Sequence, residues 1–137
     1  MSNDTFILDE RLKNDGVKLT DLKLSQVILV DNSLFPWIVL VPKKNDLKEI
    51  IDLSEQDRIT LMEEISFISN VMKEIFAPDK LNVAALGNIV SQLHIHVIAR
   101  YTNDSAWPNP VFGREKEPYT AAQREIIINK FLSFLEK

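Results

Sequence analysis

The stretch LHIHVIA, residues 93–99, constrains the fold more than any other part of the chain. Successive side chains of a β-strand point to opposite faces of the sheet. The odd-numbered positions form a continuous apolar face: Leu93, Ile95, Val97 and Ala99. The even-numbered positions form a mainly polar face: Gln92, His94, His96 and Arg100, with Ile98 among them. An apolar sheet face needs a helix packed against it, so this stretch predicts a layered protein.

Residues 54–78 supply a helix that can cover the apolar face. Ser54 followed three residues later by Asp57 is typical of a helix N-terminus, and Pro78 marks the end. Apolar residues recur between them at helical spacing: Leu61, Ile65, Ile68, Met72 and Ile75. The pattern therefore predicts a long helix with one apolar stripe.

The remaining segments predict an antiparallel sheet with helices on it, in the α+β class. Residues 26–30 and 37–41 read as a hairpin, residues 82–86 and 93–99 as two strands around Gly87-Asn88, and residues 120–137 as a C-terminal helix. Thr120 with Gln123 three residues later is a capping pair for that helix. The segment from Phe6 to Leu24 is ambiguous.

The size and composition predict a single domain spanning residues 1–137. A chain of 137 residues has the size of one ordinary domain, and 45% hydrophobic residues suffice for a core. The absence of cysteine excludes disulfides, thiolate metal sites and cysteine nucleophiles.

Charge and hydropathy limit the partners that we expect. The chain has 20 acidic and 16 basic side chains, and no basic run is longer than Lys43-Lys44, which disfavours binding to long nucleic acid. No stretch approaches the ~18 apolar residues of a membrane span. The start MSNDTF is polar, so we expect a cytoplasmic protein without a membrane partner.

The polar face holds both histidines of the chain, and their placement on one face needs a physical reason. Burying imidazoles without hydrogen-bond partners costs about 1–3 kcal/mol per group. Four interpretations are open: histidines tolerated on a half-exposed sheet, a metal site completed by Asp or Glu, a catalytic pair, or a ligand site without chemistry.

Catalysis fits the spacing of His94 and His96, because side chains two apart on a strand run side by side at about 6.5–7 Å. A neutral imidazole is a good nucleophile toward phosphorus if its other nitrogen donates its proton to a fixed acceptor. The second imidazole, when protonated, can stabilise oxygen charge or protonate the leaving group.

The residues QLHIHVIAR resemble the signature of the histidine triad (HIT) family, in which three histidines alternate with apolar residues. The resemblance implies that His94 is the central histidine, which attacks the α-phosphate of a nucleotide, and that His96 is the third. Gln92 stands at the first position, which departs from the pattern. An amide cannot be protonated, but its backbone carbonyl can still accept a hydrogen bond from the nucleophile's ring.

Two further segments are similar to the family. The segment VDNSLFPWIVLVPKK is similar to its hairpin, which implies that Asp31 holds the ribose hydroxyls. Gly87-Asn88 resembles its phosphate loop, which implies that Asn88 contacts phosphate. Leu29 and Val30 are candidates for the base pocket.

The resemblance implies a fold of about five antiparallel strands with a long central helix and a C-terminal helix. It implies a homodimeric nucleotide hydrolase or transferase that forms a covalent nucleotidyl-His94 intermediate. The substrate would be a small nucleotide conjugate, with no cofactor and no metal needed for the attack. The alternatives are a nucleotide-binding module with weak catalysis and a structural metal site at His94 and His96.

Overall fold

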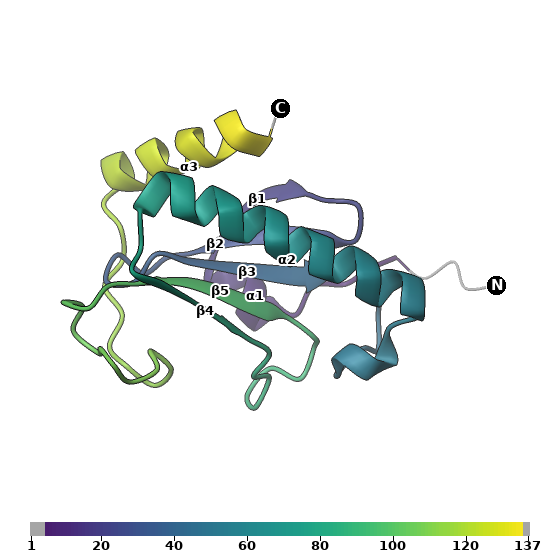
Figure 1. Ribbon diagram of the computed structural model, residues 1–137. Helices are drawn as coiled ribbons and strands as arrows, with labels where there is room; N and C mark the ends of the chain where they lie inside the picture. Colours follow the sequence, from purple (N-terminus) through teal and green to yellow (C-terminus); the bar gives the residue numbers. More distant parts are fainter. Residues whose placement is uncertain (1–4, 136–137) are drawn as a thin grey trace.

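A five-stranded antiparallel sheet forms the centre of the molecule (Figure 1). The computed structural model describes residues 5–135. The strand order is β1-β2-β3-β5-β4. The strands are β1 (Gly16–Asp21), β2 (Ser25–Val30), β3 (Trp37–Pro42), β4 (Lys80–Ala84) and β5 (Ile95–Arg100). The predicted hairpin is thus β2–β3, and β5 lies between β3 and β4.

Two long helices cover one face of this sheet (Figure 1). Helix α2 (Glu55–Phe76) runs across the strands, and α3 (Ala121–Leu135) lies beside it. Ser54 caps α2 by accepting a hydrogen bond from the backbone N–H of Asp57, as its sequence predicts. Leu61, Ile68 and Met72 of the predicted stripe are buried against the sheet. Each such side chain contributes roughly 1.5–3 kcal/mol through burial.

The alternation along residues 93–100 is confirmed. The apolar face packs in the cluster under the two long helices: Leu93, Ile95, Val97 and Ala99. Ile98 packs in a second cluster on the opposite face, together with Trp37 and Val39 of β3. The short helix α1 (Glu10–Asn14) and a 3-10 turn (Ile50–Asp52) complete the elements. The predicted α+β fold is therefore observed.

Element boundaries differ from the sequence expectation near the histidines. Strand β5 begins at Ile95, so Leu93 and His94 lie just before it. Strand β4 ends at Ala84 rather than at Leu86, which leaves residues 85–94 as a connection. Gly87 has φ 66, a conformation that glycine adopts without steric cost. The connection can therefore turn sharply beside the histidines.

The ambiguous N-terminal segment forms α1 and β1 on the edge of the sheet. Strand β1 approaches β2 very closely at Gly16, where an added Cβ would lie 1.9 Å from the carbonyl oxygen of Leu29. Glycine is required there, because any side chain would push the two strands apart. Helix α1 lies on the face opposite the long helices, where Leu12 packs with Trp37 and Ile98.

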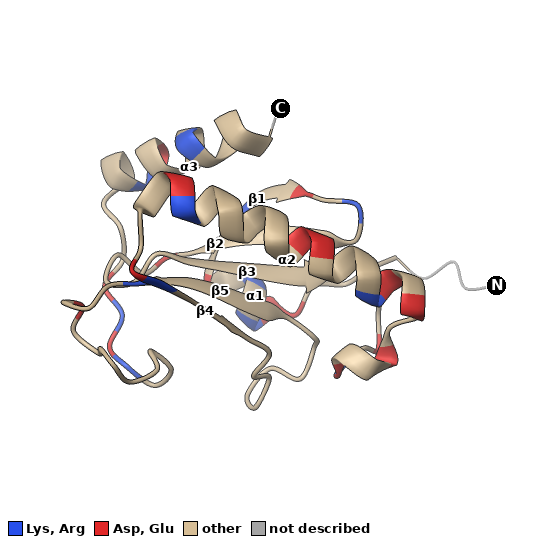
Figure 2. Ribbon diagram, viewed as in Figure 1, with Lys and Arg blue, Asp and Glu red and all other residues tan. Residues whose placement is uncertain are grey.

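Charged residues of both signs are spread over the helices and loops (Figure 2). In this view lysine and arginine positions alternate with acidic ones along α2 and do not merge into one basic strip. None of the helices within residues 5–135 is long and apolar enough to span a membrane.

Candidate active site

A cavity of about 640 Å³ opens on the sheet face opposite α2 and α3. Its lining includes His94 and His96, which are 6% and 8% exposed. The sheet contributes apolar side chains: Ile28, Val30, Trp37 and Val39. The remaining walls come from α1 and its end, from residues 86–90 and from residues 112–116. Five separate stretches of the chain thus meet around the two imidazoles.

The ring of His94 is oriented by the backbone of Gln92. His94 Nδ1 lies 2.7 Å from the carbonyl oxygen of Gln92. A carbonyl oxygen only accepts, so Nδ1 carries the proton and donates it. The lone pair is therefore on Nε2, which is the arrangement that an imidazole nucleophile requires.

The ring of His96 is held in the opposite tautomer. Trp37 Nε1 donates a hydrogen bond of 3.0 Å to His96 Nδ1. An indole nitrogen is a donor only, so Nδ1 of His96 must be an unprotonated acceptor and Nε2 carries the hydrogen. Burial, and then the neighbouring His94, lower the pKa of His96 to about 4. His96 is thus a neutral donor, and not the imidazolium that the sequence suggested for the second histidine.

Aromatic edges fix the position of both rings. The centroid of His96 lies 4.8 Å from that of His94 and 4.9 Å from that of Phe112. Trp37 packs edge-on against His96 and Phe112 at 5.5 and 5.6 Å. Such T-shaped pairs are favourable arrangements for aromatic rings. The imidazoles are therefore pre-positioned by rigid neighbours.

The structure brings some of the residues predicted for nucleotide binding to this cavity and not others. Asn88 and Val30 line it, beside His94 and His96. Leu29 does not: it is 1% exposed and packs in the cluster under the helices. Neighbouring residues of a strand point to opposite faces, so Val30 and Leu29 cannot share a pocket.

Asp31 also lies outside the cavity lining. Its Oδ1 accepts a hydrogen bond of 2.9 Å from the backbone N–H of Tyr119, and its Oδ2 lies 3.9 Å from Arg124. These contacts fasten the segment that leads into α3. The carboxylate that does line the cavity is Asp15, whose own carbonyl accepts from the Asp31 backbone N–H at 2.9 Å.

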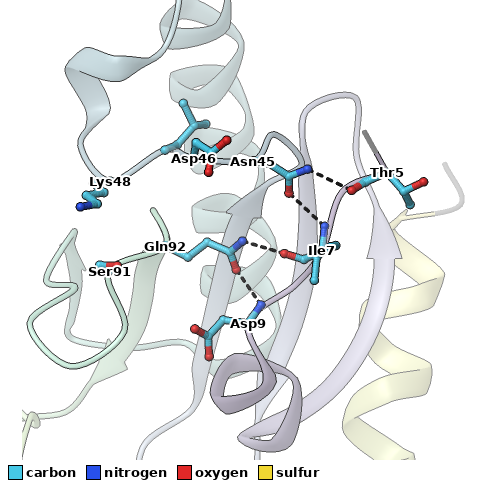
Figure 3. A pocket seen from close by; sticks show the side chains of 9 residues that line it. Thr5, Ile7, Asp9, Asn45, Asp46, Lys48, Ser91 and Gln92 are labelled. Carbon is cyan, nitrogen blue, oxygen red and sulfur yellow. Dashed lines mark hydrogen bonds between the residues drawn. The ribbon is translucent and has the colours of Figure 1, made fainter. Parts of the chain in front are cut away.

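Gln92 turns its side chain away from the two histidines. Its amide forms hydrogen bonds with Asp9 and Ile7 of the N-terminal segment (Figure 3). It lines a different hollow, beside Asn45 and Ser91. Only the backbone of Gln92 reaches the histidine pair, and Arg100 bonds Asp104 and Asn82, so only His94 and His96 of the predicted polar face line the cavity.

Sequence reasoning missed several residues of the cavity. Trp37 lies diagonally across the β3–β5 pair from His96, because Val39 is directly opposite His96 and Trp37 is opposite Ile98. That relationship becomes visible only once the register is known. Ile28 and Val39 were missed on β2 and β3 for the same reason. Further missed residues come from the ambiguous segment or from loops: Arg11, Leu12, Asp15, Phe112 and Lys116.

No group of three or more His, Asp or Glu side chains within residues 5–135 is arranged to hold a metal ion. Nδ1 of each histidine is engaged, by Gln92 and by Trp37 respectively. Two Nε2 atoms alone fall short of the three protein ligands that a zinc site takes.

Comparison with known proteins identifies relatives of this chain. The family model of the HIT domain matches residues 11–103. A histidine triad protein from Bradyrhizobium japonicum is 44% identical, with 95% of this chain and 98% of that chain covered and a TM-score of 0.93. One from Marinobacter aquaeolei VT8 is 42% identical, with 97% and 98% covered and a TM-score of 0.94.

More distant structures share the fold. The diadenosine triphosphate hydrolase of Plasmodium falciparum, in complex with Cyclomarin A, is 21% identical and has a TM-score of 0.67, with 99% of this chain and 87% of that chain covered. A comparison with curated proteins gives no match.

Proposed function

Because this chain belongs to the HIT domain family, whose members are commonly nucleotide hydrolases or transferases, we propose that it cleaves nucleotide conjugates at the α-phosphate through a covalent nucleotidyl-His94 intermediate. One observation carries the proposal: the 2.7 Å hydrogen bond from His94 Nδ1 to the Gln92 carbonyl. It leaves the Nε2 lone pair free inside the cavity, where an α-phosphate can reach it.

The first step is attack of His94 Nε2 on the α-phosphorus. An N–P bond forms, and the bond from phosphorus to the leaving group breaks, with its electron pair going to the leaving group; a phosphate departs as its anion, and an amine departs with a proton taken from water. The nucleotidylated ring is then cationic, since Nδ1 keeps its proton. The carbonyl oxygen of Gln92 accepts from that proton and stabilises the charge.

The second step transfers the nucleotidyl group to water or to another acceptor. The acceptor oxygen bonds to phosphorus, the N–P bond breaks, and His94 regains its lone pair while the acceptor's proton is released. His96 donates from Nε2 to a non-bridging phosphate oxygen in both steps and remains neutral. The attack by imidazole requires no metal ion and no cofactor.

The cavity provides complementary places for the parts of a nucleotide. Apolar residues can contact the base: Leu12, Ile28, Val30 and Val39. The Asp15 carboxylate can accept from two vicinal ribose hydroxyls, which is the role that the sequence suggested for Asp31. Asn88, on a loop that lines the cavity with His94, can contact phosphate.

We also propose a homodimer formed along β4. This strand lies at the edge of the sheet, so one side of its backbone faces no other strand within residues 5–135. Val83, near the end of β4, is 49% exposed. Free edges with exposed apolar side chains pair readily with another strand. Light scattering should therefore give a dimer mass, and Val83→Lys should shift it toward the monomer; a wild-type monomer would contradict this.

One observation favours a second candidate, a nucleotide-binding module with little catalysis. The side chain of Gln92 is bonded outside the cavity, so only two imidazoles remain to act on a phosphate. Such a module would keep the apolar floor and Asp15 and would bind AMP without forming a covalent intermediate.

A labelling experiment separates the two functions. Wild type and His94→Ala are incubated with an α-³²P-labelled dinucleoside polyphosphate or adenosine phosphoramidate, and acid-labile covalent label is measured. Label on the wild type alone supports the enzyme. Affinity for AMP without label on either protein would support the binding module instead.

A further inference from the structure

The N-terminal segment is fastened beside the cavity by two side-chain amides (Figure 3). Asn45 accepts from the backbone N–H of Ile7 at 3.0 Å and donates to the carbonyl of Thr5 at 2.9 Å. Gln92 accepts from the N–H of Asp9 at 2.8 Å and donates to the carbonyl of Ile7 at 2.9 Å. The two amides thus bond alternate residues of an extended segment, as a neighbouring strand would.

We call residues 5–9 the N-terminal strap. Asp9, at its end, holds the side chain of Arg11 in place. Its Oδ1 accepts from the Arg11 backbone N–H at 2.9 Å and from Nε at 3.1 Å, and its Oδ2 accepts from Nη2 at 3.0 Å. Nη1 of Arg11 donates to the carbonyl of Ile89 at 3.2 Å. A guanidinium has five N–H groups, so one donor on each terminal nitrogen is left for a ligand.

These two donors lie at the mouth of the cavity. Arg11 lines the same cavity as His94 and Asn88. Its side chain is 58% exposed, whereas His94 is 6% exposed. A substrate whose α-phosphate reaches His94 can therefore contact Arg11 with its leaving group or with its base.

The hydrogen-bond donors of Arg11 favour contact with the leaving group over contact with the base. A guanidinium with two adjacent donors matches phosphate oxygens, and the apolar floor of the cavity matches the base. The other cation of the lining, Lys116, lies 3.4 Å from Asp15, which is the proposed ribose contact. Arg11, bonded to the loop that carries Asn88, is on the phosphate side.

We propose that Arg11 is a substrate contact for a phosphate group of the leaving group, and that Gln92 is its positioning residue. The inference rests on the proposed function of the cavity and narrows its substrate class to nucleotides with a phosphate beyond the α-phosphate. It also gives Gln92 two tasks: its backbone orients His94, and its side chain holds the segment that orients Arg11.

The first test compares two substrates that share the adenylyl group. Diadenosine triphosphate has a phosphate-bearing leaving group, and adenosine phosphoramidate leaves ammonia. The ratio of their kcat/KM values should fall at least fivefold in Arg11→Gln, mainly through KM for the triphosphate. Lys13→Gln is the matched control, because Lys13 is on the same helix and outside the cavity lining. A ratio within fivefold of the wild-type value in Arg11→Gln would overturn the proposal.

The second test separates positioning from fold stability. Gln92→Leu removes both side-chain hydrogen bonds but keeps the backbone carbonyl, so it should lower the same ratio at least fivefold while His94 still accepts label. Asn45→Leu removes the two hydrogen bonds to Thr5 and Ile7, which lie further from Arg11, and should lower the ratio less. An equal loss on both substrates in Gln92→Leu would show a general structural role and overturn the positioning role.

A binding measurement keeps the inference independent of turnover. In Arg11→Gln, calorimetric titration should show affinity for ATP reduced at least fivefold more than affinity for AMP. If the wild type forms no covalent label and yet this difference appears, the proposed reaction fails and the Arg11 contact stands. If label forms and the difference is absent, the reaction stands and the Arg11 contact fails.

Discussion

The indole nitrogen of Trp37 donates a 3.0 Å hydrogen bond to Nδ1 of His96, across the β3–β5 pair. This single donor decides the tautomer of the second histidine. Protonation of His96 at Nδ1 would place two N–H groups against each other. The two imidazoles are therefore suited to different tasks, with a free lone pair on His94 and a neutral N–H on His96.

Trp37→Phe should change the pH dependence of the reaction. The ring packing is largely kept, but Nδ1 of His96 is then free to accept a proton. The pKa of His96 should rise from about 4, because the indole N–H no longer faces the atom that takes the proton, while burial and His94 still hold it below its ordinary value of 6.5. Since the neutral form is the donor proposed here, the acid limb of the kcat profile should move to higher pH in the variant.

Nitrogen NMR checks the tautomer directly. In the wild type at pH 7, the ¹⁵N shifts of His96 should show a bare Nδ1 and a protonated Nε2. Trp107→Phe, which alters an indole that packs against Arg100, is the matched control and should leave those shifts unchanged. A protonated Nδ1 on His96 in the wild type would contradict the assignment.

His96 should make the fold less stable in mild acid. Its pKa is lowered in the folded state, so the unfolded chain binds the proton more readily. The stability is fully present above pH 6.5 and is lost as pH falls toward about 4, by roughly 3 kcal/mol at most. Urea unfolding at pH 7 and pH 5 measures this loss, which should be smaller in His96→Gln; equal losses would contradict it.

Asp15→Asn should weaken recognition of the sugar. The variant should lose about five- to tenfold in affinity for AMP and much less for 2′,3′-dideoxy-AMP, which lacks the hydroxyls. Asp31→Asn serves as the comparison, because that carboxylate holds Tyr119 and lies outside the cavity lining. If Asp31→Asn alone abolished the discrimination between the two ligands, the ribose contact would be Asp31 and not Asp15.

Arg100→Met should be strongly destabilising. Arg100 is 1% exposed and donates to both carboxylate oxygens of Asp104, at 2.8 and 3.1 Å, and to Asn82 at 2.8 Å. Removing one partner of a buried ion pair costs about 3–5 kcal/mol. Lys18→Met breaks an exposed pair with Asp21 and should cost under about 1 kcal/mol. Chemical denaturation of the two variants measures the difference, and similar losses would contradict it.

The ion pair between Arg100 and Asp104 should also make the stability of the fold fall in acid. The Arg100 hydrogen bond holds the pKa of Asp104 well below its ordinary value of 3.8. This stability is present above that ordinary value and is lost as pH falls through the lower folded-state pKa. Asp104→Asn should therefore flatten the acid end of the stability profile measured by urea unfolding, and an unchanged slope there would contradict the assignment.

The sequence alone determined the layers and the placement of the histidine pair on one face of the sheet. Alternation along residues 93–99 separated an apolar core face from a polar face. The apolar stripe of residues 61–75 identified the helix that covers the core face. These patterns are local, because a strand repeats every two residues and a helix every 3.6. For the same reason the strand pattern by itself singles out His94 and His96.

Only the tertiary structure decided how the histidine rings are oriented and hydrogen-bonded. Trp37 reaches His96 from 59 residues away, and Gln92 reaches Asp9 from 83 residues away. The strand places Leu29 in the core under the helices. Asp31 is hydrogen-bonded to Tyr119 and lies outside the cavity lining, whereas Asp15 lines the cavity. Tautomers, hydrogen-bond partners and cavity walls depend on which distant segments meet, and no local periodicity encodes that.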